Sequence, residues 1–255
     1  MLQTIIDHKA QELDARRRAR PLASLRDAPL FAAPRRDFAA ALAARGRRVI
    51  AEVKRASPSR GRIRDDFDPV AIASGYEQAG AAAVSVLTEE RFFEGSLDHL
   101  TAVRARVAIP VLRKDFLFEP YHLYEARAAG ADAFLLIAAM LTTEHLRELI
   151  ALGEELEMTA LVEVHTREQI ERAHGTGVRV WGINNRDLDT FETRLETGLA
   201  LLPLIPPGAT VVIESGLKTA ADLARFESIG VRAFLIGETL MRAPDPGAAL
   251  GALLR

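Results

Sequence analysis

Short apolar segments recur along this chain, and most of them end on a charged or amide residue. The segment Val49–Val53 carries Glu52 and stops at Lys54. Later segments end on or beside Lys114, Glu163, Asn184, Glu214 and Glu238. A fully buried parallel strand does not need charge along its length. In a barrel of parallel strands, however, the carboxyl ends of the strands carry the chemistry. The pattern therefore predicts a parallel fold whose functional groups gather at one end.

The apolar segments alternate regularly with helical patterns, which favours a parallel sheet with right-handed crossovers. Candidate strands begin near Val49, Ala83, Ile109, Ala133, Ala160, Val180, Thr210 and Ala233. A weak repeat places Gly80, Gly130, Gly177 and Gly230 between a helical stretch and a strand, where glycine suits the left-handed turn that ends a helix. Eight strands with eight helices in roughly 210 residues match a (β/α)8 barrel better than a doubly wound sheet. Neither G-x-G-x-x-G nor a P-loop follows the first strand.

Residues 1–46 differ from the rest because they contain no strand-like segment. The pattern predicts a helix near Leu2–Arg20, a proline-punctuated connector and a short helix around Asp37–Arg45. We therefore expect residues 1–255 to form a single barrel domain, with residues 1–46 as a helical N-terminal extension.

Composition excludes several classes of function. A net charge of −2 creates no general field for nucleic acid or an anionic membrane. The chain has no cysteine, which excludes disulfides, thiolate-ligated zinc and thiol nucleophiles. The histidines lack metal-ligand spacing, so we expect no metal site. No secretory signal and no apolar run of about 18 residues is present. We therefore expect a cytoplasmic protein without nucleic-acid or membrane partners.

Convergence of the strand ends would bring two lysines and three glutamates to one mouth. A structural ion-pair network explains any one of these residues equally well. For the whole set a functional site is favoured, because buried charges are costly unless they pair or act on a ligand. Ser215-Gly216 and Gly237 follow the last two strands, where many barrels bind phosphate, although ordinary turns also use glycine.

Three further features remain open or structural at this stage. The loop containing Ser57 and Gly61 is either a lid over phosphate or a solvated surface loop. Phe92 and Phe93 either line a pocket or pack beneath a loop. Trp181 lies inside a strand segment and is expected in the core.

Seven motifs together resemble the signature of the indole-3-glycerol-phosphate synthase family, in order between Val49 and Arg242. They are Ile50–Ser59, Ser85–Glu89, Leu112–Phe116, Leu161–His165, Gly182–Leu188, Ile213–Gly216 and Leu235–Glu238. The resemblance implies a (β/α)8 barrel whose N-terminal helices pack at the mouth. It also implies a lyase of tryptophan biosynthesis that acts on 1-(2-carboxyphenylamino)-1-deoxyribulose 5-phosphate and releases CO2 and water. No metal or organic cofactor is implied.

The resemblance also implies roles for individual residues. Lys114 would be the general acid for ring closure. Lys54, Glu52 and Glu163 would share the remaining proton transfers, in a division that the sequence leaves open. Positioning of substrate hydroxyls and lysines would fall to Asn184 and Glu214. The substrate's carboxylate, aromatic ring and phosphate would be bound by Arg186 (carboxylate), Phe93, Phe116 and Leu188 (ring), and Ser57, Ser215, Gly216, Gly237 and Glu238 (phosphate).

Three positions depart from the family pattern. Arg60 stands where lysine is common, which preserves the charge. Glu94 stands where a small or amide residue is common, and its side chain is expected to point away from the substrate. Glu238 stands where some members have serine, so its backbone N–H would serve the phosphate.

Two rival functions remain. A phosphoribosylanthranilate isomerase-like barrel resembles an Asp/Cys design, and this chain has no cysteine. A non-catalytic phosphosugar-binding barrel would keep Gly216 and Gly237 but would not need both lysines and three glutamates. The sequence leaves a monomer and a weak homo-oligomer equally open.

Overall fold

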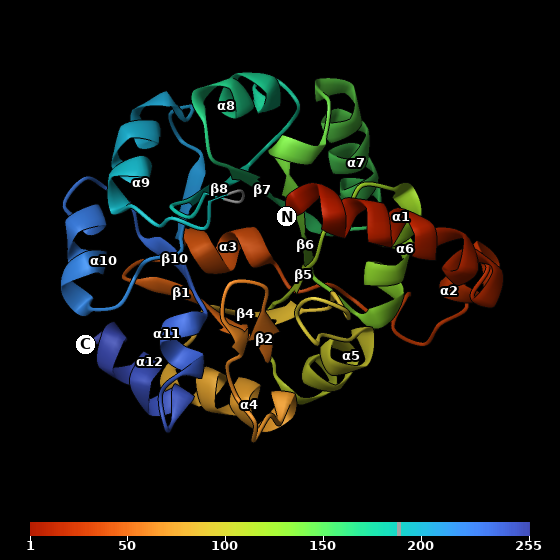
Figure 1. The fold of residues 1–255 in the computed structure, drawn as a ribbon, viewed down its shortest axis with the longest axis horizontal. Helices are drawn as coiled ribbons and strands as arrows, with labels where there is room; N and C mark the ends of the chain where they lie inside the picture. Colours follow the sequence, from red (N-terminus) through yellow and green to blue (C-terminus); the bar gives the residue numbers. More distant parts are fainter. Residues whose placement is uncertain (188–189) are drawn as a thin grey trace.

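Eight parallel strands close into a barrel, and helices pack around its outside (Figure 1). The computed structural model describes residues 1–187 and 190–255. The barrel strands are β1 (Arg48–Val53), β4 (Ala83–Leu87), β5 (Val111–Lys114), β6 (Ala133–Ile137), β7 (Thr159–Val164), β8 (Val180–Asn184), β9 (Thr210–Glu214) and β10 (Ala233–Ile236). The ring closes because β1 pairs with β10 on one side and with β4 on the other. The (β/α)8 barrel predicted from the sequence is confirmed.

The helices begin and end where local sequence signals place them. Asp68, Thr142 and Thr219, each directly before a helix, accept hydrogen bonds from first-turn backbone N–H groups. The repeated glycines all have φ between 94° and 98°, so each makes the left-handed turn expected of it. The helices are α1 (Leu2–Ala19), α2 (Leu22–Arg26), α3 (Phe38–Ala43), α4 (Pro69–Ala79), α5 (Leu97–Arg106), α6 (Pro120–Ala129), α7 (Thr143–Glu155), α8 (Arg167–Ala173), α9 (Leu195–Leu201), α10 (Ala220–Glu227), α11 (Glu238–Met241) and α12 (Pro246–Leu254), with 3-10 turns at Ala138–Met140 and Leu202–Leu204. None of the helices in the described ranges has both the length and the apolarity needed to cross a membrane.

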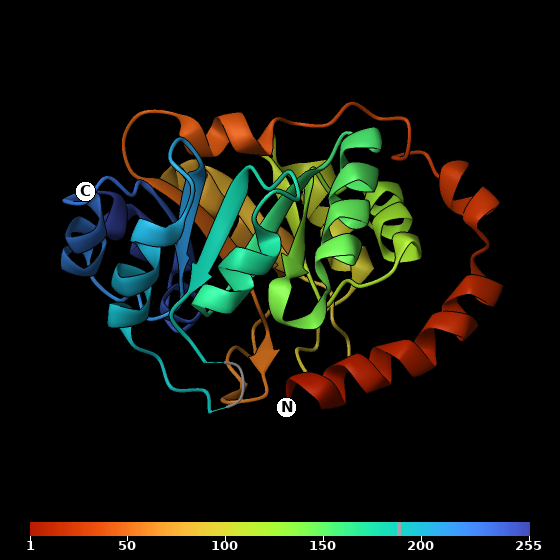
Figure 2. The ribbon, with the colours of Figure 1, turned by 90° about the horizontal axis from the view of Figure 1, so that it is seen from above.

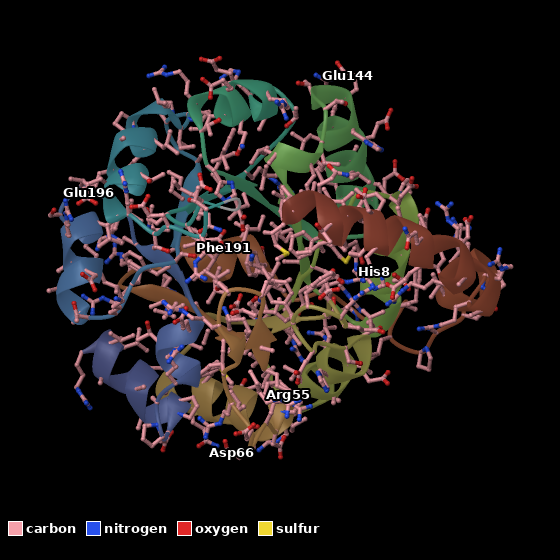
Figure 3. All side chains as sticks on the ribbon, in the orientation of Figure 1. His8, Arg55, Asp66, Glu144, Phe191 and Glu196 are labelled. Carbon is pink, nitrogen blue, oxygen red and sulfur yellow. The ribbon has the colours of Figure 1, made fainter. Side chains whose placement is uncertain are left out.

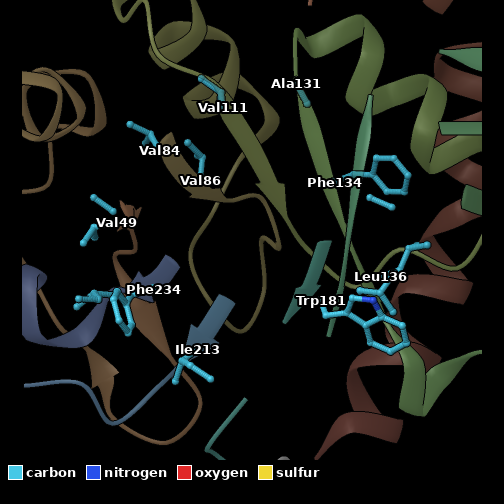
Figure 4. Packing of buried hydrophobic residues seen from close by; sticks show 14 of the residues in the cluster. Val49, Val84, Val86, Val111, Ala131, Phe134, Leu136, Trp181, Ile213 and Phe234 are labelled. Carbon is cyan, nitrogen blue, oxygen red and sulfur yellow. The ribbon is translucent and has the colours of Figure 1, made fainter. Parts of the chain in front are cut away.

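Side chains of the barrel strands alternate between two layers, as the strand period of two requires. One layer, which includes Ile50, Leu112 and Leu161, fills the barrel interior. The other layer, which includes Phe134 and Trp181, packs outward beneath the helices (Figure 4). Trp181 is only 1% exposed and is a core residue, as predicted. This alternation decides which charged residues can face the cavity at the end of the barrel.

Residues 1–46 contact both ends of the barrel. At the carboxyl ends of the strands, the α1 residue Lys9 forms an ion pair with Asp115 (Nζ–Oδ1 2.7 Å). At the opposite end lies α3 (Figure 2). Its Phe38 and Leu42 are buried against the interior cluster. The resemblance implied that the N-terminal helices pack at the mouth of the barrel, and this expectation is wrong for α3. Its two large apolar side chains, four residues apart on one helix face, cover the amino ends of the strands.

The apolar segment Ile109–Leu112 stops before Arg113, but strand β5 continues to Lys114. Arg113 therefore lies inside the strand and is 1% exposed. Its side chain takes the outward layer and contacts Asp115 (Nη2–Oδ2 3.2 Å) and Glu125 (Nη2–Oε2 3.5 Å). A buried charge is tolerated there because it is paired.

Candidate active site

A cavity of about 520 Å³ opens at the carboxyl ends of the barrel strands. Of the fifteen site residues predicted from the sequence, fourteen line it: Glu52, Lys54, Ser57, Phe93, Lys114, Phe116, Glu163, Asn184, Arg186, Glu214, Ser215, Gly216, Gly237 and Glu238. The fifteenth, Leu188, lies outside the described residues. The structure therefore brings together residues from β1, β5, β7, β8 and β9 and from the segments that follow β1, β4, β5, β8, β9 and β10.

The loop after β1 forms part of the cavity wall. It folds as an antiparallel hairpin of β2 (Ala56–Ser57) and β3 (Gly61–Arg62). Ser57, Ser59 and Arg60 of this hairpin line the cavity. The hairpin therefore lies at the mouth of the cavity, which is where a lid over phosphate would have to lie.

Lys114 and two glutamates form the centre of the site. Nζ of Lys114 lies 3.1 Å from Oε2 of Glu163 and 3.7 Å from Oε2 of Glu214. Each of the three residues stands two positions after an interior residue of its own strand, so the alternation aims all three side chains inward. Both glutamates are 1% exposed. The ammonium group is thus held by carboxyl groups from two other strands.

Burial and charge act on the pKa values of this cluster in opposite directions. Burial lowers the pKa of Lys114, but the carboxyl groups of Glu163, Glu214 and Glu52 outweigh it and raise that pKa. Burial raises the pKa of Glu163, but the ammonium of Lys114 and a hydrogen bond from Asn184 bring it down to about 2. Burial and the neighbouring Glu163 raise the pKa of Glu214 well above its ordinary value. At neutral pH the cluster therefore holds an ammonium at Lys114 and a carboxylate at Glu163, while burial and Glu163 favour the protonated form of Glu214.

A second ammonium–carboxylate pair lies at the end of β1. Nζ of Lys54 is 2.6 Å from Oε1 of Glu52, and Glu52 is 4% exposed. Both residues line the same cavity as Lys114. The cavity thus offers two separate proton donors beside carboxylates, which is the requirement of general acid–base chemistry at more than one atom.

One wall of the cavity is apolar. Leu135 and Ile137 of β6 line it, together with the rings of Phe93 and Phe116, whose centroids are 5.9 Å apart. Phe92 instead contacts the ring of His8 on α1, edge to face at 5.9 Å. Phe93 therefore lines the pocket, whereas Phe92 packs against helix α1 and not beneath a loop.

The part of the cavity wall around Arg186, which follows β8, is polar and charged. Its guanidinium donates to Glu238 (Nη2–Oε2 3.0 Å) and to Ser59 (Nη1–Oγ 3.1 Å). Ser215 and Gly216 both have positive φ, 64° and 80°, and turn the backbone after β9 along the cavity. This part of the wall combines a cation with residues that have small side chains or none.

Glu94 is directed toward the hairpin. Its two carboxylate oxygens accept hydrogen bonds from Nε and Nη2 of Arg62, at 3.2 and 3.1 Å. Nε of Arg55 also lies 3.3 Å from Oε2 of Glu94. These contacts agree with the expectation that its side chain is turned away from the central cluster.

Sequence reasoning missed several cavity-lining residues, among them Phe191, and also His165, which contacts Glu163 without lining the cavity. His165 lies 3.3 Å (Nε2–Oε1) from Glu163, and its place two residues after Glu163 could have signalled that both share a face. Phe191, in the loop after β8, lines the cavity with a φ of 60° (Figure 3). No sequence pattern signals Phe191, because its position depends on the loop conformation.

Comparisons with known proteins agree with this site. The family model described as Indole-3-glycerol phosphate synthase matches residues 2–253. A relative named indole-3-glycerol phosphate synthase from Dehalococcoides mccartyi (strain CBDB1) is 49% identical over 258 residues, covering 100% of both chains. A protein with the same name from Laribacter hongkongensis (strain HLHK9) is 48% identical, covering 99% of this chain and 98% of that protein.

Solved structures of lower identity share the barrel fold. KGPDC from Streptococcus mutans matches with a TM-score of 0.63 at 15% identity, over 82% of this chain and 96% of that one. The 3-hexulose-6-phosphate synthase from Salmonella typhimurium matches with a TM-score of 0.65 at 10% identity, over 81% of this chain and 98% of that one. These likenesses concern the fold alone, whereas the full-length family match concerns the whole chain. The chain belongs to the indole-3-glycerol phosphate synthase family.

Proposed function

We propose that this protein converts 1-(2-carboxyphenylamino)-1-deoxyribulose 5-phosphate to indole-3-glycerol phosphate, CO2 and water, as a carboxy-lyase of tryptophan biosynthesis. The aromatic carbon that bears the carboxylate attacks the ribulose carbonyl carbon. The carbonyl oxygen takes up a proton, CO2 leaves, and the new hydroxyl group then leaves as water. Ring closure and dehydration each move a proton to or from a substrate atom, whereas loss of CO2 returns the electron pair of the broken carbon–carbon bond to the ring, so the protein must place acids and bases around one cavity.

The observation that carries the proposal is the position of Lys114 between Glu163 and Glu214 in the cavity. The carboxyl groups raise the pKa of Lys114, so it remains an ammonium at neutral pH despite its burial. An ammonium beside the carbonyl can donate its proton as the carbon–carbon bond forms, and its charge stabilises the developing alkoxide. We therefore assign ring closure to Lys114 as general acid.

Dehydration needs a donor for the leaving hydroxyl group and an acceptor for the proton that is lost. Lys54 and Glu52, in contact at 2.6 Å, supply one ammonium and one carboxylate. Glu163 supplies a second carboxylate, because its pKa of about 2 keeps it ionised. We assign dehydration to these three residues, with Asn184 orienting Glu163.

The remaining cavity residues match the shape and charge of the substrate. The apolar wall of Phe93, Phe116, Leu135 and Ile137 would receive the aromatic ring. Arg186 would bind the carboxylate, since a guanidinium matches its geometry. We assign phosphate binding to a group of residues from the loops after β1, β9 and β10: Ser57, Ser215, Gly216, Gly237 and the backbone of Glu238.

The direct test incubates the purified protein with the carboxyphenylamino-deoxyribulose phosphate and follows indole fluorescence. We expect product formation with the wild type. A wild type that binds the substrate but forms no indole would instead support the non-catalytic phosphosugar-binding alternative. Turnover of phosphoribosylanthranilate in place of this substrate would support the isomerase-like alternative.

Two substitutions separate proton donation from simple charge at Lys114. Lys114→Met removes both, whereas Lys114→Arg keeps a positive charge that does not give up its proton in proteins. We expect each variant to lose about a hundredfold to ten-thousandfold in kcat, the usual share of general acid catalysis. A Lys114→Arg variant with wild-type kcat would show that charge alone suffices.

A further inference from the structure

Three arginines from separate segments converge on the carboxylate of Glu238, the first residue of α11. Its Oε2 accepts from Nη2 of Arg186 at 3.0 Å. Its Oε1 lies 3.2 Å from Nε of Arg60 and 3.2 Å from Nε of Arg242. Arg60 belongs to the turn of the β2–β3 hairpin, and Arg186 follows β8. One carboxylate thus connects the loops after the first, sixth and eighth barrel strands.

The long-range contacts are the informative ones. Arg242 stands four residues after Glu238 on the same turn of chain, a spacing at which such pairs form readily. Arg60 and Arg186 have no such local reason to meet Glu238. Partial burial raises the pKa of Glu238, but the hydrogen bond and charge of Arg186, with the charges of Arg60 and Arg242, lower it overall. The carboxylate is therefore ionised at neutral pH.

The guanidinium of Arg186 is held at both of its outer amino groups. Glu238 accepts from Nη2, and Oγ of Ser59 accepts from Nη1 at 3.1 Å. Within residues 1–187 and 190–255, Nε of Arg186 is buried and has no hydrogen-bond partner. A guanidinium presents its donors in one rigid plane, so holding two of its groups fixes where the remaining N–H groups point.

We propose that Glu238 is a positioning residue that fixes the orientation of Arg186 for the carboxylate of the substrate and attaches the β2–β3 hairpin to the mouth through Arg60. The first half of this inference rests on the proposed ring-closure function for the identity of the anion. The second half concerns the protein alone. From the sequence we expected only the backbone N–H of Glu238 to contact phosphate. The positioning of Arg186 and Arg60 is a separate role for its side chain.

Steady-state kinetics of Glu238→Ala and Glu238→Gln test the positioning role. Loss of one charge-assisted hydrogen bond corresponds to a change of about tenfold in affinity, so we expect Glu238→Ala to raise KM about tenfold. We expect kcat to stay within about threefold, because no proton passes through this carboxylate. Glu238→Gln keeps an oxygen that can accept from Arg186 and should recover most of the lost affinity. A purely structural role would not predict this recovery in KM.

Glu227 provides a matched control. Its side chain is 22% exposed, against 23% for Glu238, and it accepts hydrogen bonds from Nε and Nη2 of Arg47, both at 2.8 Å. It lies on α10, away from the cavity-lining residues. We expect Glu227→Ala to leave KM and kcat unchanged.

A second measurement does not depend on turnover. Trypsin cleaves after arginine, and the side chain of Arg60 is 54% exposed. If Glu238 attaches the hairpin, cleavage after Arg60 should be several-fold faster in Glu238→Ala than in wild type or Glu227→Ala, because a released segment opens more often. This result stands even if the wild type forms no indole, so the two failures can be told apart.

Opposite kinetic results would overturn the proposal. A lower KM in both Glu238→Ala and Glu238→Gln would mean that Glu238 competes with the substrate for Arg186. An unchanged KM together with an unchanged rate of cleavage after Arg60 would mean that the contacts of Glu238 have no positioning role.

Discussion

Gly182 in β8 lies directly against the carboxyl group of Glu214 in β9, so a Cβ on this glycine would overlap Oε1 of Glu214. Gly237 has the same relationship with Oε1 of Glu52. Two of the four glutamates that line the cavity therefore occupy space that only a residue without a side chain leaves open. Gly237 was expected to serve phosphate, and the structure adds that it makes room for a carboxylate.

Gly182→Ala should disturb the acid–base cluster. The added methyl group displaces Glu214, which lies 3.7 Å from Nζ of Lys114. We expect kcat/KM to fall by at least about tenfold and the free energy of unfolding to fall by about 1–3 kcal/mol, the usual cost of overpacking a core. Steady-state kinetics and urea unfolding measure the two effects.

The control for this variant is Gly251→Ala in α12, where an added Cβ meets no atom within 4 Å. We expect unchanged kinetics and a gain in stability of up to about 1 kcal/mol, because alanine is the better helix former. Wild-type kinetics in Gly182→Ala would contradict the importance of this close contact.

Phe93→Ala and Phe92→Ala should have contrasting effects, although the two residues are adjacent. Phe93 lines the cavity beside Phe116, whereas Phe92 contacts His8 on α1. Removing Phe93 deletes part of the apolar wall, so we expect KM to rise about tenfold, by the loss of roughly 1.5 kcal/mol of ring burial. Removing Phe92 should lower stability by about 2 kcal/mol and leave KM unchanged. If both variants changed KM equally, the division between pocket and helix packing would be wrong.

The sequence predicted the central cluster well because strand alternation is a local property. Glu52, Glu163 and Glu214 each share the parity of an interior residue two positions earlier, so facing the cavity follows from the barrel itself. The contact between Arg186 and Glu238 could not be predicted in this way. It depends on how separate loops fold against each other, and loop conformation has no such periodic signal.

The placement of residues 1–46 was only partly predictable for a related reason. Helical periodicity indicated where α1 and α3 form, but not which end of the barrel each one covers. The decisive partners are Asp115 for Lys9 and the interior apolar residues for Phe38, and both contacts are long-range.

Lys9→Met should destabilise the protein strongly. Lys9 and Asp115 are 5% and 0% exposed at their side chains, and their charged atoms are 2.7 Å apart. Removing the ammonium leaves a buried carboxylate with fewer cations, so we expect a loss of about 3 kcal/mol in the free energy of unfolding. Arg17→Met on the same helix is the control, because the Arg17–Glu119 pair is exposed and should contribute no more than about 1 kcal/mol. Equal losses in urea unfolding would show that burial does not set the strength of these pairs.

Glu214→Gln should change how stability depends on pH. Burial and the charge of Glu163 raise the pKa of Glu214 in the folded protein. A raised carboxyl pKa contributes stability that is fully present below the unfolded-state pKa, near 4.3, and is lost as pH rises through the folded-state value. The glutamine variant has no such loss. Its unfolding free energy, relative to wild type, should therefore increase with pH above about 4.5, by at most about 1.4 kcal/mol per pH unit.

Glu227→Gln is the comparison variant, because the pKa of Glu227 is shifted in the opposite direction to that of Glu214. The hydrogen bond and charge of Arg47 lower the pKa of Glu227 despite partial burial. Its contribution is present above the unfolded-state pKa and is lost only as pH falls, so the difference between Glu227→Gln and wild type should stay constant between about pH 5 and pH 8. Urea unfolding across that range measures both differences. A constant difference for Glu214→Gln as well would show that Glu214 is ionised in the folded protein, and that Lys114 faces two carboxylates.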